Sequence, residues 1–213
     1  MKGFDYSEIK DSKTYDKLRP VGKAVAKLLY KIEYVGLENV PEDGGFILAS
    51  NHMDALDPVF IAIGLENRQL HFMGKKELFE NPVSKWALSK LNGFPIVRGG
   101  ADTEALEYAI RIPKEGHILG IFPEGTRSKT FKPARAKSGV AMIAKEAKTD
   151  VLPVSIYTSD NMKKGTKLTI RFGEIIPYEK LGFTEEGSRE ELKTCAKYIM
   201  DEIIKLWEMG HCE

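Results

Sequence analysis

The sequence is short of cysteine and of net charge. Its two cysteines, Cys195 and Cys212, show no spacing typical of a metal site, and we expect reduced thiols in an intracellular protein. The 213 residues carry a net charge of +1, so the chain as a whole is neither an acidic carrier nor a polyanion binder such as a nucleic-acid-binding protein. Any attraction to charged partners must come from local patches.

Long apolar runs are also missing. No window approaches 18 uncharged apolar residues, so a transmembrane helix is not expected. The N-terminal stretch MKGFDYSEIKDSK lacks the apolar core and the cleavage site of a secretory signal. Repeats and Gly/Ser linkers are absent too, and the length fits one domain. We therefore expect a cytoplasmic protein, peripheral on the inner face of the cell membrane if it meets a membrane at all.

Strand-like apolar runs alternate with helical patterns along the chain. This alternation predicts a single α/β domain with a central, mostly parallel mixed sheet flanked by helices. The predicted strands cover residues 32–36, 46–50, 70–73, 95–97, 118–122, 151–157 and 167–172. The predicted helices cover residues 18–31, 58–65, 82–91, 101–112, 139–147 and 188–208, the last beginning with a capping-box pattern at Ser188 and Glu191.

Residues 1–33 form an N-terminal amphipathic arm ahead of the α/β domain at 34–213. Two neighbouring stripes recur there at helical spacing, an apolar one and a basic one: Leu18, Val21, Val25, Leu28 and Ile32, and Arg19, Lys23, Lys27 and Lys31. One interpretation is a helix packed on the domain with a solvated lysine face. The other is an interfacial arm that contacts an anionic membrane surface. Composition leaves both open.

The segment from Ser50 to Pro58 is the most informative for chemistry. It follows an apolar strand and precedes an apolar helix, so His52 falls in a strand-to-helix loop, where α/β proteins expose reactive groups. Asp57 stands at a natural N-cap with Pro58 after it. In such a loop Asp57 can both cap the helix and orient the imidazole of His52. His52 is therefore the candidate general base.

No convincing nucleophile accompanies this base. The sequence has no G-x-S-x-G elbow, and neither cysteine has a neighbourhood that indicates activation. The simplest interpretation is that His52 deprotonates a substrate hydroxyl directly. A metal site formed by His52, Asp54 and Asp57 is the alternative, although no second ligand cluster supports it. The remaining histidines, His71, His117 and His211, show no partner pattern and are expected to be structural or solvent-exposed.

Three further segments carry glycine, proline and cations at strand ends. Residues 121–128 (IFPEGTRS) can grip a phosphate through backbone N–H groups and the guanidinium of Arg127. Residues 93–100 (GFPIVRGG) place Arg98 among glycines, and residues 151–156 (VLPVSI) form an apolar strand with one proline. Each of these segments alone is a weak indication of function.

In this order, the segments resemble the lysophosphatidic acid acyltransferases, a family of the glycerolipid acyltransferases. The NHxxxxD block corresponds to Asn51-His52 through Asp57, and the FPEGTRS block to residues 122–128. The other blocks correspond to residues 94–98 and 151–156, and Lys75-Lys76-Glu77-Leu78 resembles the family's lysine-containing segment. The resemblance covers roughly residues 35–175.

The resemblance implies a role for each matching residue. His52 would be the general base toward the sn-2 hydroxyl of lysophosphatidic acid, with Asp57 as its orienting partner. The acceptor's phosphate would be bound by cations and by the FPEGTRS loop: Lys75, Arg98, Arg127, Glu124, Gly125 and Thr126. The donor would be acyl-ACP or acyl-CoA, with direct transfer, no acyl-enzyme, no metal and no bound cofactor.

Two other functions remain open at this point. The same chemistry could act on glycerol-3-phosphate or on a lyso-aminolipid, because each acceptor needs the same base. A non-catalytic lipid-surface binding protein could also be built on this fold, although such a relative would be expected to have lost His52 or Asp57.

Overall fold

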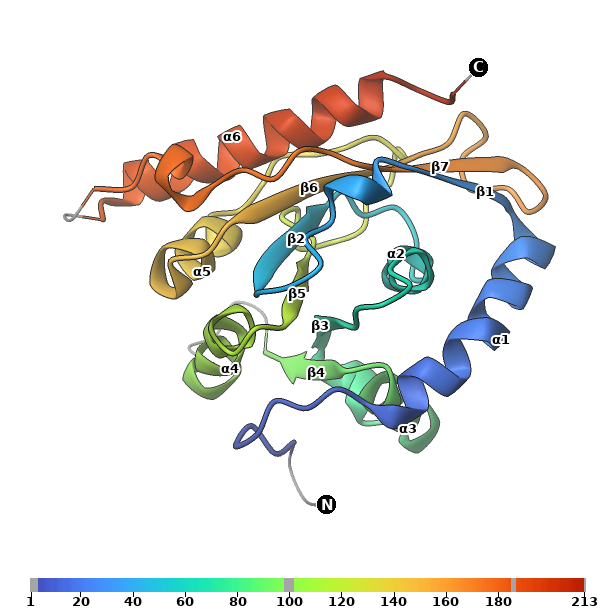
Figure 1. Ribbon diagram of the computed structural model, residues 1–213, viewed down its shortest axis with the longest axis horizontal. Coiled ribbons are helices and arrows are strands. Elements are labelled where there is room, and N and C mark those ends of the chain that lie inside the picture. Colours follow the sequence, from blue (N-terminus) through green and yellow to red (C-terminus); the bar gives the residue numbers. More distant parts are fainter. Residues whose placement is uncertain (1–3, 98–101, 185–186, 213) are drawn as a thin grey trace.

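The computed structural model describes residues 4–97, 102–184 and 187–212. Within these residues seven strands form one sheet, in the order β1-β7-β6-β2-β5-β3-β4 (Figure 1). All neighbouring strands run parallel except β6 and β7. The strands are β1 Lys31–Val35, β2 Phe46–Ser50, β3 Leu70–Lys75, β4 Gly93–Ile96, β5 Ile118–Ile121, β6 Val151–Tyr157 and β7 Lys167–Phe172. The predicted mostly parallel, mixed α/β sheet is confirmed.

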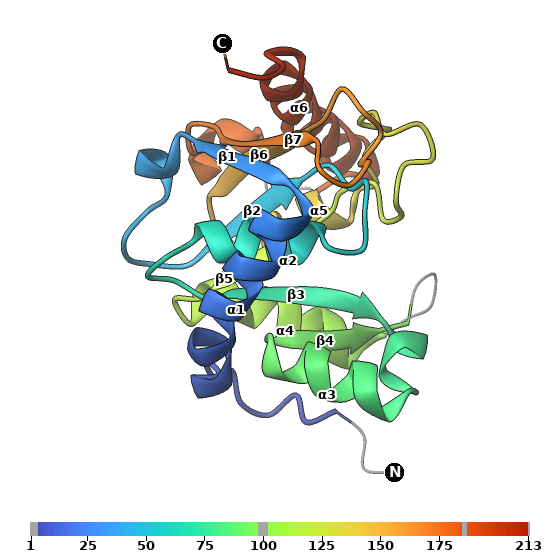
Figure 2. The ribbon, with the colours of Figure 1, turned by 90° about the vertical axis from the view of Figure 1, so that its right-hand side faces the viewer.

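Helices cover both faces of the sheet (Figures 1 and 2). One core layer joins the sheet to α4, α5 and α6, and the other joins it to α1 and α2. Because both faces are covered, the central strand β2 is buried at every position. Its residues accordingly form a nearly continuous apolar run without the alternation of a half-exposed strand. The helices are α1 Lys13–Leu29, α2 Asp57–Gly64, α3 Pro82–Lys90, α4 Thr103–Lys114, α5 Gly139–Ala147 and α6 Arg189–Glu208, with short 3₁₀ turns at Leu37–Asn39, Lys76–Phe79 and Tyr178–Leu181.

Helix α1 differs from its prediction at both ends. It begins five residues earlier than expected, at Lys13, and ends at Leu29, because Tyr30 adopts an extended backbone that leads into β1. Ile32 therefore belongs to the sheet, where β1 pairs with β7, and not to the helical stripe. The boundary suggested at residues 33 and 34 falls inside β1, so the arm and the domain share one sheet.

Helix α1 is packed on the domain, as one interpretation of the arm expects, but it also exposes apolar side chains, as the interfacial interpretation expects. Tyr15 and Ala26 are buried against the domain. Arg19 donates a hydrogen bond to the carbonyl of Arg68, and Lys23 pairs with Glu66, so these two cations hold the helix on the domain. On the outer face, three apolar side chains of the stripe are exposed: Val21, Val25 and Leu28, the last 84% exposed.

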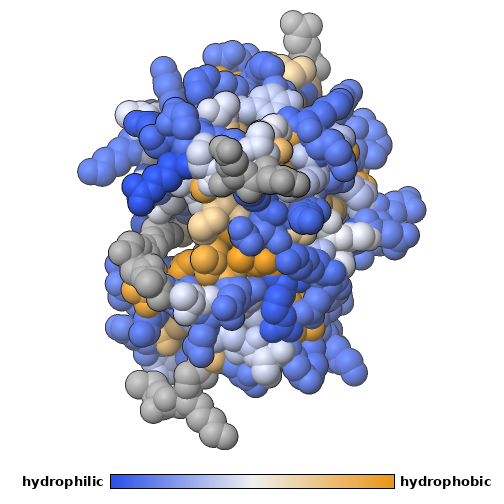
Figure 3. Space-filling model, turned by 90° about the vertical axis from the view of Figure 1, so that its left-hand side faces the viewer, coloured by the Kyte–Doolittle hydropathy of each residue, from blue (hydrophilic) through white to orange (hydrophobic). Residues whose placement is uncertain are grey.

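None of the described helices is both long enough and apolar enough to cross a bilayer. The side of the molecule that carries α4 and α5, opposite α1, displays an apolar band among hydrophilic residues (Figure 3). Apolar surface is thus present on two sides of the molecule, over α1 and beside α4 and α5.

Candidate active site

The parallel strands bring the predicted blocks to one edge of the sheet. The carboxyl ends of β2, β5, β3, β4 and β6 lie along this edge, because all five strands run in the same direction. The His52 loop follows β2, the loop of residues 122–128 follows β5, and Lys75 ends β3. Ligand sites of open α/β sheets lie at this edge.

His52 and Asp57 form the predicted pair. Nδ1 of His52 lies 2.8 Å from Oδ2 of Asp57, and the histidine side chain is 13% exposed whereas the aspartate is fully buried. With Nδ1 donating to the carboxylate, Nε2 is the unprotonated nitrogen of the neutral ring. No described residue bonds to Nε2, so this atom can accept a proton from a substrate.

Asp57 orients the loop and does not cap α2. Its Oδ2 also accepts the backbone N–H groups of Met53 and Asp54, at 2.6 and 2.8 Å. Since these donors precede the helix, the carboxylate faces back toward His52, and α2 begins at Asp57 without a side-chain cap. The expected double role is therefore wrong in its capping half. Burial raises the pKa of Asp57, and hydrogen bonds from His52 and the loop oppose that rise.

The imidazole ring also has a stacking partner. The ring of Phe122 stacks on His52 with a centroid separation of 4.0 Å and an angle of 18° between planes. The backbone N–H of Ser128 donates to the carbonyl of His52 at 2.8 Å. The FPEGTRS loop thus holds the base from one face of the ring and from its backbone.

Glu124 contacts the base itself. Its Oε1 accepts the backbone N–H of His52 at 2.9 Å, and the side chain is almost fully buried. Burial raises the pKa of this carboxyl group. The side chain of Glu124 thus contacts the backbone of His52, and we expect it to position the His52 loop. Its part in the phosphate site stays a prediction.

Asn51 belongs to the NHxxxxD block, and the structure gives it a role that the sequence analysis does not assign. Its side chain imitates a backbone peptide: Nδ2 donates to the carbonyl of Ile156 at 3.0 Å, and Oδ1 accepts the N–H of Ile156 at 2.8 Å. Asn51 is fully buried and ties the loop after β2 to the end of β6. A buried side-chain amide needs hydrogen-bond partners, and an asparagine directly after an apolar strand is the sequence feature that could have indicated this contact.

The predicted phosphate-binding residues lie at the same edge. Arg127 and Thr126 are exposed in the loop after β5, and Arg127 has no partner among the described residues. Gly125 has φ +68°, and its N–H closes a turn onto the carbonyl of Phe122 at 2.9 Å. The left-handed backbone explains why glycine stands there.

Lys75 and Arg98 are the other two cations predicted to bind the phosphate. Lys75 is half-exposed at the end of β3, with Nζ 3.1 Å from Glu77. Arg98 lies outside the described residues.

An apolar cavity of about 190 Å³ lies between α1 and α2. Pro58 and Val59, the residues after Asp57, line it together with side chains from α1, α2, β3 and the end of α3: Tyr15, Leu18, Arg19, Val21, Gly22, Ala62, Ile63, Phe72 and Leu91. Two residues of its lining thus follow Asp57 directly in the chain, and the cavity extends under the amphipathic helix.

The alternative metal site at His52, Asp54 and Asp57 receives no support. Within residues 4–97, 102–184 and 187–212 these three side chains do not converge as a ligand cluster. The carboxylate of Asp54 instead accepts the N–H of Leu56 at 2.9 Å. Of the cysteines, Cys195 is buried and its pKa is raised to about 12, so it is not an activated nucleophile.

Comparisons with known proteins identify the family of the chain. The family model described as Acyltransferase matches residues 31–157. A 1-acyl-sn-glycerol-3-phosphate acyltransferase of Bacillus subtilis (strain 168) is 31% identical over 191 residues, covering 86% of this chain and 92% of the relative. One of Streptococcus pneumoniae (strain ATCC BAA-255 / R6) is 31% identical over 194 residues, covering 86% and 70%.

A solved structure shares the architecture as well. The crystal structure of the 1-acyl-sn-glycerophosphate (LPA) acyltransferase, PlsC, from Thermotoga maritima superposes with a TM-score of 0.72 at 28% identity, covering 93% of this chain and 81% of that chain. The matching model, the relatives and the fold all include the His52 and Phe122–Ser128 loops. The chain therefore belongs to the acyltransferase family that contains the 1-acyl-sn-glycerol-3-phosphate acyltransferases.

Proposed function

We propose that this protein transfers a fatty acyl group from an acyl thioester to the sn-2 hydroxyl of lysophosphatidic acid, giving phosphatidic acid. The observation that carries the proposal is the contact between Nδ1 of His52 and the buried Asp57, which leaves Nε2 to act as a base. The names of the relatives supply the acceptor, lysophosphatidic acid. The donor is a thioester of either acyl carrier protein or coenzyme A.

The reaction follows from the position of Nε2. This atom takes the proton of the acceptor hydroxyl while the oxygen attacks the thioester carbonyl, forming a tetrahedral intermediate. The intermediate collapses as the C–S bond breaks, and the departing thiolate takes the proton back from His52. Asp57 stabilises the imidazolium form between these steps, and base catalysis of this kind contributes ~10²–10⁴-fold. No covalent acyl-enzyme forms, and the chain's own residues need no cofactor for these steps.

Binding of the acceptor phosphate brings the hydroxyl to the base. Arg127, exposed and without a described partner, offers a bidentate guanidinium, and Lys75 adds charge from the end of β3. Arg98, which the sequence predicts to join them, lies outside the described residues. Gly125 and Thr126 shape the loop between these cations and His52. A hydroxyl held in this way reacts as though in an intramolecular step, which accounts for several kcal/mol of the barrier.

The apolar cavity between α1 and α2 accommodates an acyl chain. Its lining begins at Pro58, one residue from Asp57, and is almost wholly apolar. A fatty acyl group in the cavity would therefore place its carbonyl end near the base. The length of the cavity would then influence which chain lengths are accepted.

Helix α1 provides the membrane contact in this proposal. Val21, Val25 and Leu28 are exposed on its outer face, and Lys17 and Lys27 are exposed on the same helix. Apolar side chains in the headgroup zone and cations over anionic lipid favour binding to a membrane surface. The protein would thus work as a peripheral protein on the inner face of the cell membrane.

An acyl-transfer assay tests the proposal. Wild type and His52→Ala are compared with lysophosphatidate and a long-chain acyl-CoA or acyl-ACP, in the presence of excess EDTA. We expect product from the wild type and a loss of ~10²-fold or more in the variant. Unchanged transfer in a folded His52→Ala protein would favour a lipid-binding protein with a contaminating activity.

An acceptor panel separates the remaining alternatives. Glycerol-3-phosphate, a lyso-aminolipid and phosphate-free monoacylglycerol are compared with lysophosphatidate at equal concentration. Turnover of monoacylglycerol as fast as of lysophosphatidate would remove the phosphate-binding role of Arg127. A preference for glycerol-3-phosphate would keep the chemistry and change the acceptor.

A further inference from the structure

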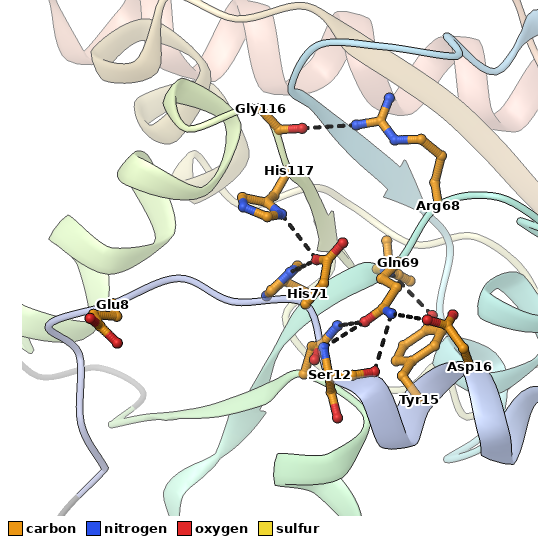
Figure 4. A network of polar contacts seen from close by, with 12 residues as sticks. Glu8, Ser12, Tyr15, Asp16, Arg68, Gln69, His71, Gly116 and His117 are labelled. Carbon is orange, nitrogen blue, oxygen red and sulfur yellow. Dashed lines mark hydrogen bonds and ion pairs between the residues drawn. The ribbon is translucent and has the colours of Figure 1, made fainter.

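Three side chains far apart in the sequence converge away from the His52 site. Asp11 lies in the segment before α1, His71 lies on β3, and His117 directly precedes β5. Oδ1 of Asp11 is 3.1 Å from Nε2 of His71 and 3.0 Å from Nδ1 of His117. Figure 4 shows both imidazole rings directed toward the same point beside Ser12 and Gln69.

The spacing of these atoms suits a small cation. The carboxylate oxygen and the two ring nitrogens all lie within 4.8 Å of one another. Zn²⁺ binds histidine nitrogen and carboxylate oxygen at ~2.0–2.2 Å, so tetrahedral ligand atoms stand ~3.3–3.5 Å apart. Side-chain shifts of less than ~1 Å would bring the three donors to that geometry.

The donor types also suit a cation. Imidazole nitrogen and carboxylate oxygen are ligands that divalent transition metals accept, and Zn²⁺ is commonly bound by this combination.

The backbone beside Asp11 is held in place by a separate network. The N–H of Ser12 donates to Oε1 of Gln69 at 2.9 Å, and Nε2 of Gln69 donates to the carbonyl of Ser12 at 3.2 Å (Figure 4). Asn92 donates to the same Oε1 at 2.8 Å. Because these bonds fix residue 12, they also fix the origin of the Asp11 side chain, which reduces the ordering needed when an ion binds.

Accessibility and charge set limits on the site. The side chain of His71 is 2% exposed, whereas those of His117 and Asp11 are 23% and 51% exposed, so solvent reaches one side of the cluster. Water can therefore complete the coordination. Arg68 opposes a cation there, because it interacts electrostatically with Asp11; its guanidinium is turned onto the carbonyls of Pro41 and Gly116.

We propose that Asp11, His71 and His117 bind one divalent transition-metal ion, best matched by Zn²⁺, which fastens the segment before α1 to β3 and β5. This site is separate from the active site. His117 precedes β5, whereas the Phe122–Ser128 loop follows it, so the two sites lie at opposite edges of the sheet. The ion is structural in this proposal, and the acyl transfer does not use it.

Titration calorimetry with Zn²⁺ tests the site on the full chain prepared without a histidine tag and stripped with EDTA. Asp11→Asn and His117→Gln keep hydrogen-bonding groups of similar shape but remove a metal ligand. Asp16→Asn and His211→Gln are the matched controls, since Asp16 also contacts the Gln69 network and His211 lies near the C-terminus. We expect one Zn²⁺ per chain in the wild type and controls, and affinity at least ~10-fold weaker in the two site variants.

Two further readouts do not depend on activity. Co²⁺ bound at the site should give the visible absorption of a four-coordinate ion, and Zn²⁺ in excess should raise the wild-type Tm by roughly 5 °C or more but not that of Asp11→Asn. Absence of Zn²⁺ binding by the wild type, or equal binding by all five proteins, would overturn the proposal. In that case a lower Tm of Asp11→Asn would identify the cluster as hydrogen-bonded only.

Discussion

The backbone N–H of His52 donates a hydrogen bond to Oε1 of Glu124 at 2.9 Å, although 72 residues separate them. The two residues follow neighbouring strands, β2 and β5, whose parallel pairing brings their loops together. The bond fixes the backbone of the base, whereas Asp57 fixes its ring. Glu124 thus sets the position of His52, and Asp57 sets its tautomer.

Two replacements of Glu124 distinguish the role of its charge from the role of its hydrogen bond to His52. Glu124→Gln retains an oxygen that accepts the His52 N–H, so we expect kcat within ~10-fold of wild type, whereas Glu124→Ala leaves a buried donor unpaired and destabilises the fold by ~1–3 kcal/mol. Steady-state kinetics and thermal unfolding measure both effects. A Glu124→Gln variant that loses activity through KM for lysophosphatidate alone would instead support contact with the substrate.

The raised pKa of Glu124 predicts how stability depends on pH. Because the folded pKa exceeds the unfolded one, protonated Glu124 stabilises the fold below about pH 4, and this contribution is lost as the pH rises through the folded pKa. As the pH rises from about 4 through the folded pKa, the Tm of the wild type should therefore fall relative to that of Glu124→Gln. A Tm difference that is constant over this range would contradict the prediction.

Asp57→Asn should reduce activity without unfolding the protein. The amide can still accept the N–H groups of Met53 and Asp54, but it does not stabilise the imidazolium form of His52, so we expect kcat to fall ~10²–10⁴-fold. Asp54→Asn is the matched control, because among the described residues the Asp54 carboxylate bonds only within its own loop, to the N–H of Leu56. Equal losses in the two variants would show that the loop, and not the pair, is what matters.

Arg127→Ala should weaken recognition of the phosphate. Loss of a charge-assisted contact of ~1.5–3 kcal/mol predicts a fall of ~10–100-fold in kcat/KM for lysophosphatidate. Lys132→Ala removes an exposed cation from the same loop and should have little effect. The assay is repeated with monoacylglycerol, for which Arg127→Ala and wild type should be equal; an equal loss on both acceptors would contradict phosphate binding.

Replacement of surface residues on α1 tests the membrane contact. Val25→Glu with Leu28→Glu removes exposed apolar contacts and adds negative charge, so sedimentation with anionic vesicles should fall by ~10-fold or more. Val83→Glu with Trp86→Glu, on α3, is the matched control, since both side chains are exposed. Loss of vesicle binding in the control pair alone would place the membrane surface over α3. Deletion of residues 1–31 is less informative, because it removes the buried Tyr15 and part of β1.

The sequence was sufficient where neighbouring residues determine the structure. The seven strands, and the contact between His52 and Asp57, follow from apolar runs and from five-residue spacing within one loop. The start of α1 was misplaced because Tyr15 is held by the distant backbone of Leu70, whose N–H donates to its hydroxyl, and local periodicity carries no trace of that contact.

Long-range contacts account for the other differences. The sequence shows the loop that carries Glu124 but not the contact of its side chain with the backbone of His52. His71 and His117 show no partner pattern in the sequence, because both contact Asp11, which lies 60 residues from the first and 106 from the second. Such convergence depends on strand order, which the sequence alone does not specify.

The pairing of β1 with β7 has a consequence for how the chain folds. Lys31 finds its sheet partner, Lys167, only after most of the chain has been synthesised. On the ribosome, β1 therefore emerges well before the strand it pairs with, and it waits for β7 although α1 can already pack on α2 and β3. The edge of the sheet at β1 thus closes late, as expected of a pairing between strands far apart in the sequence.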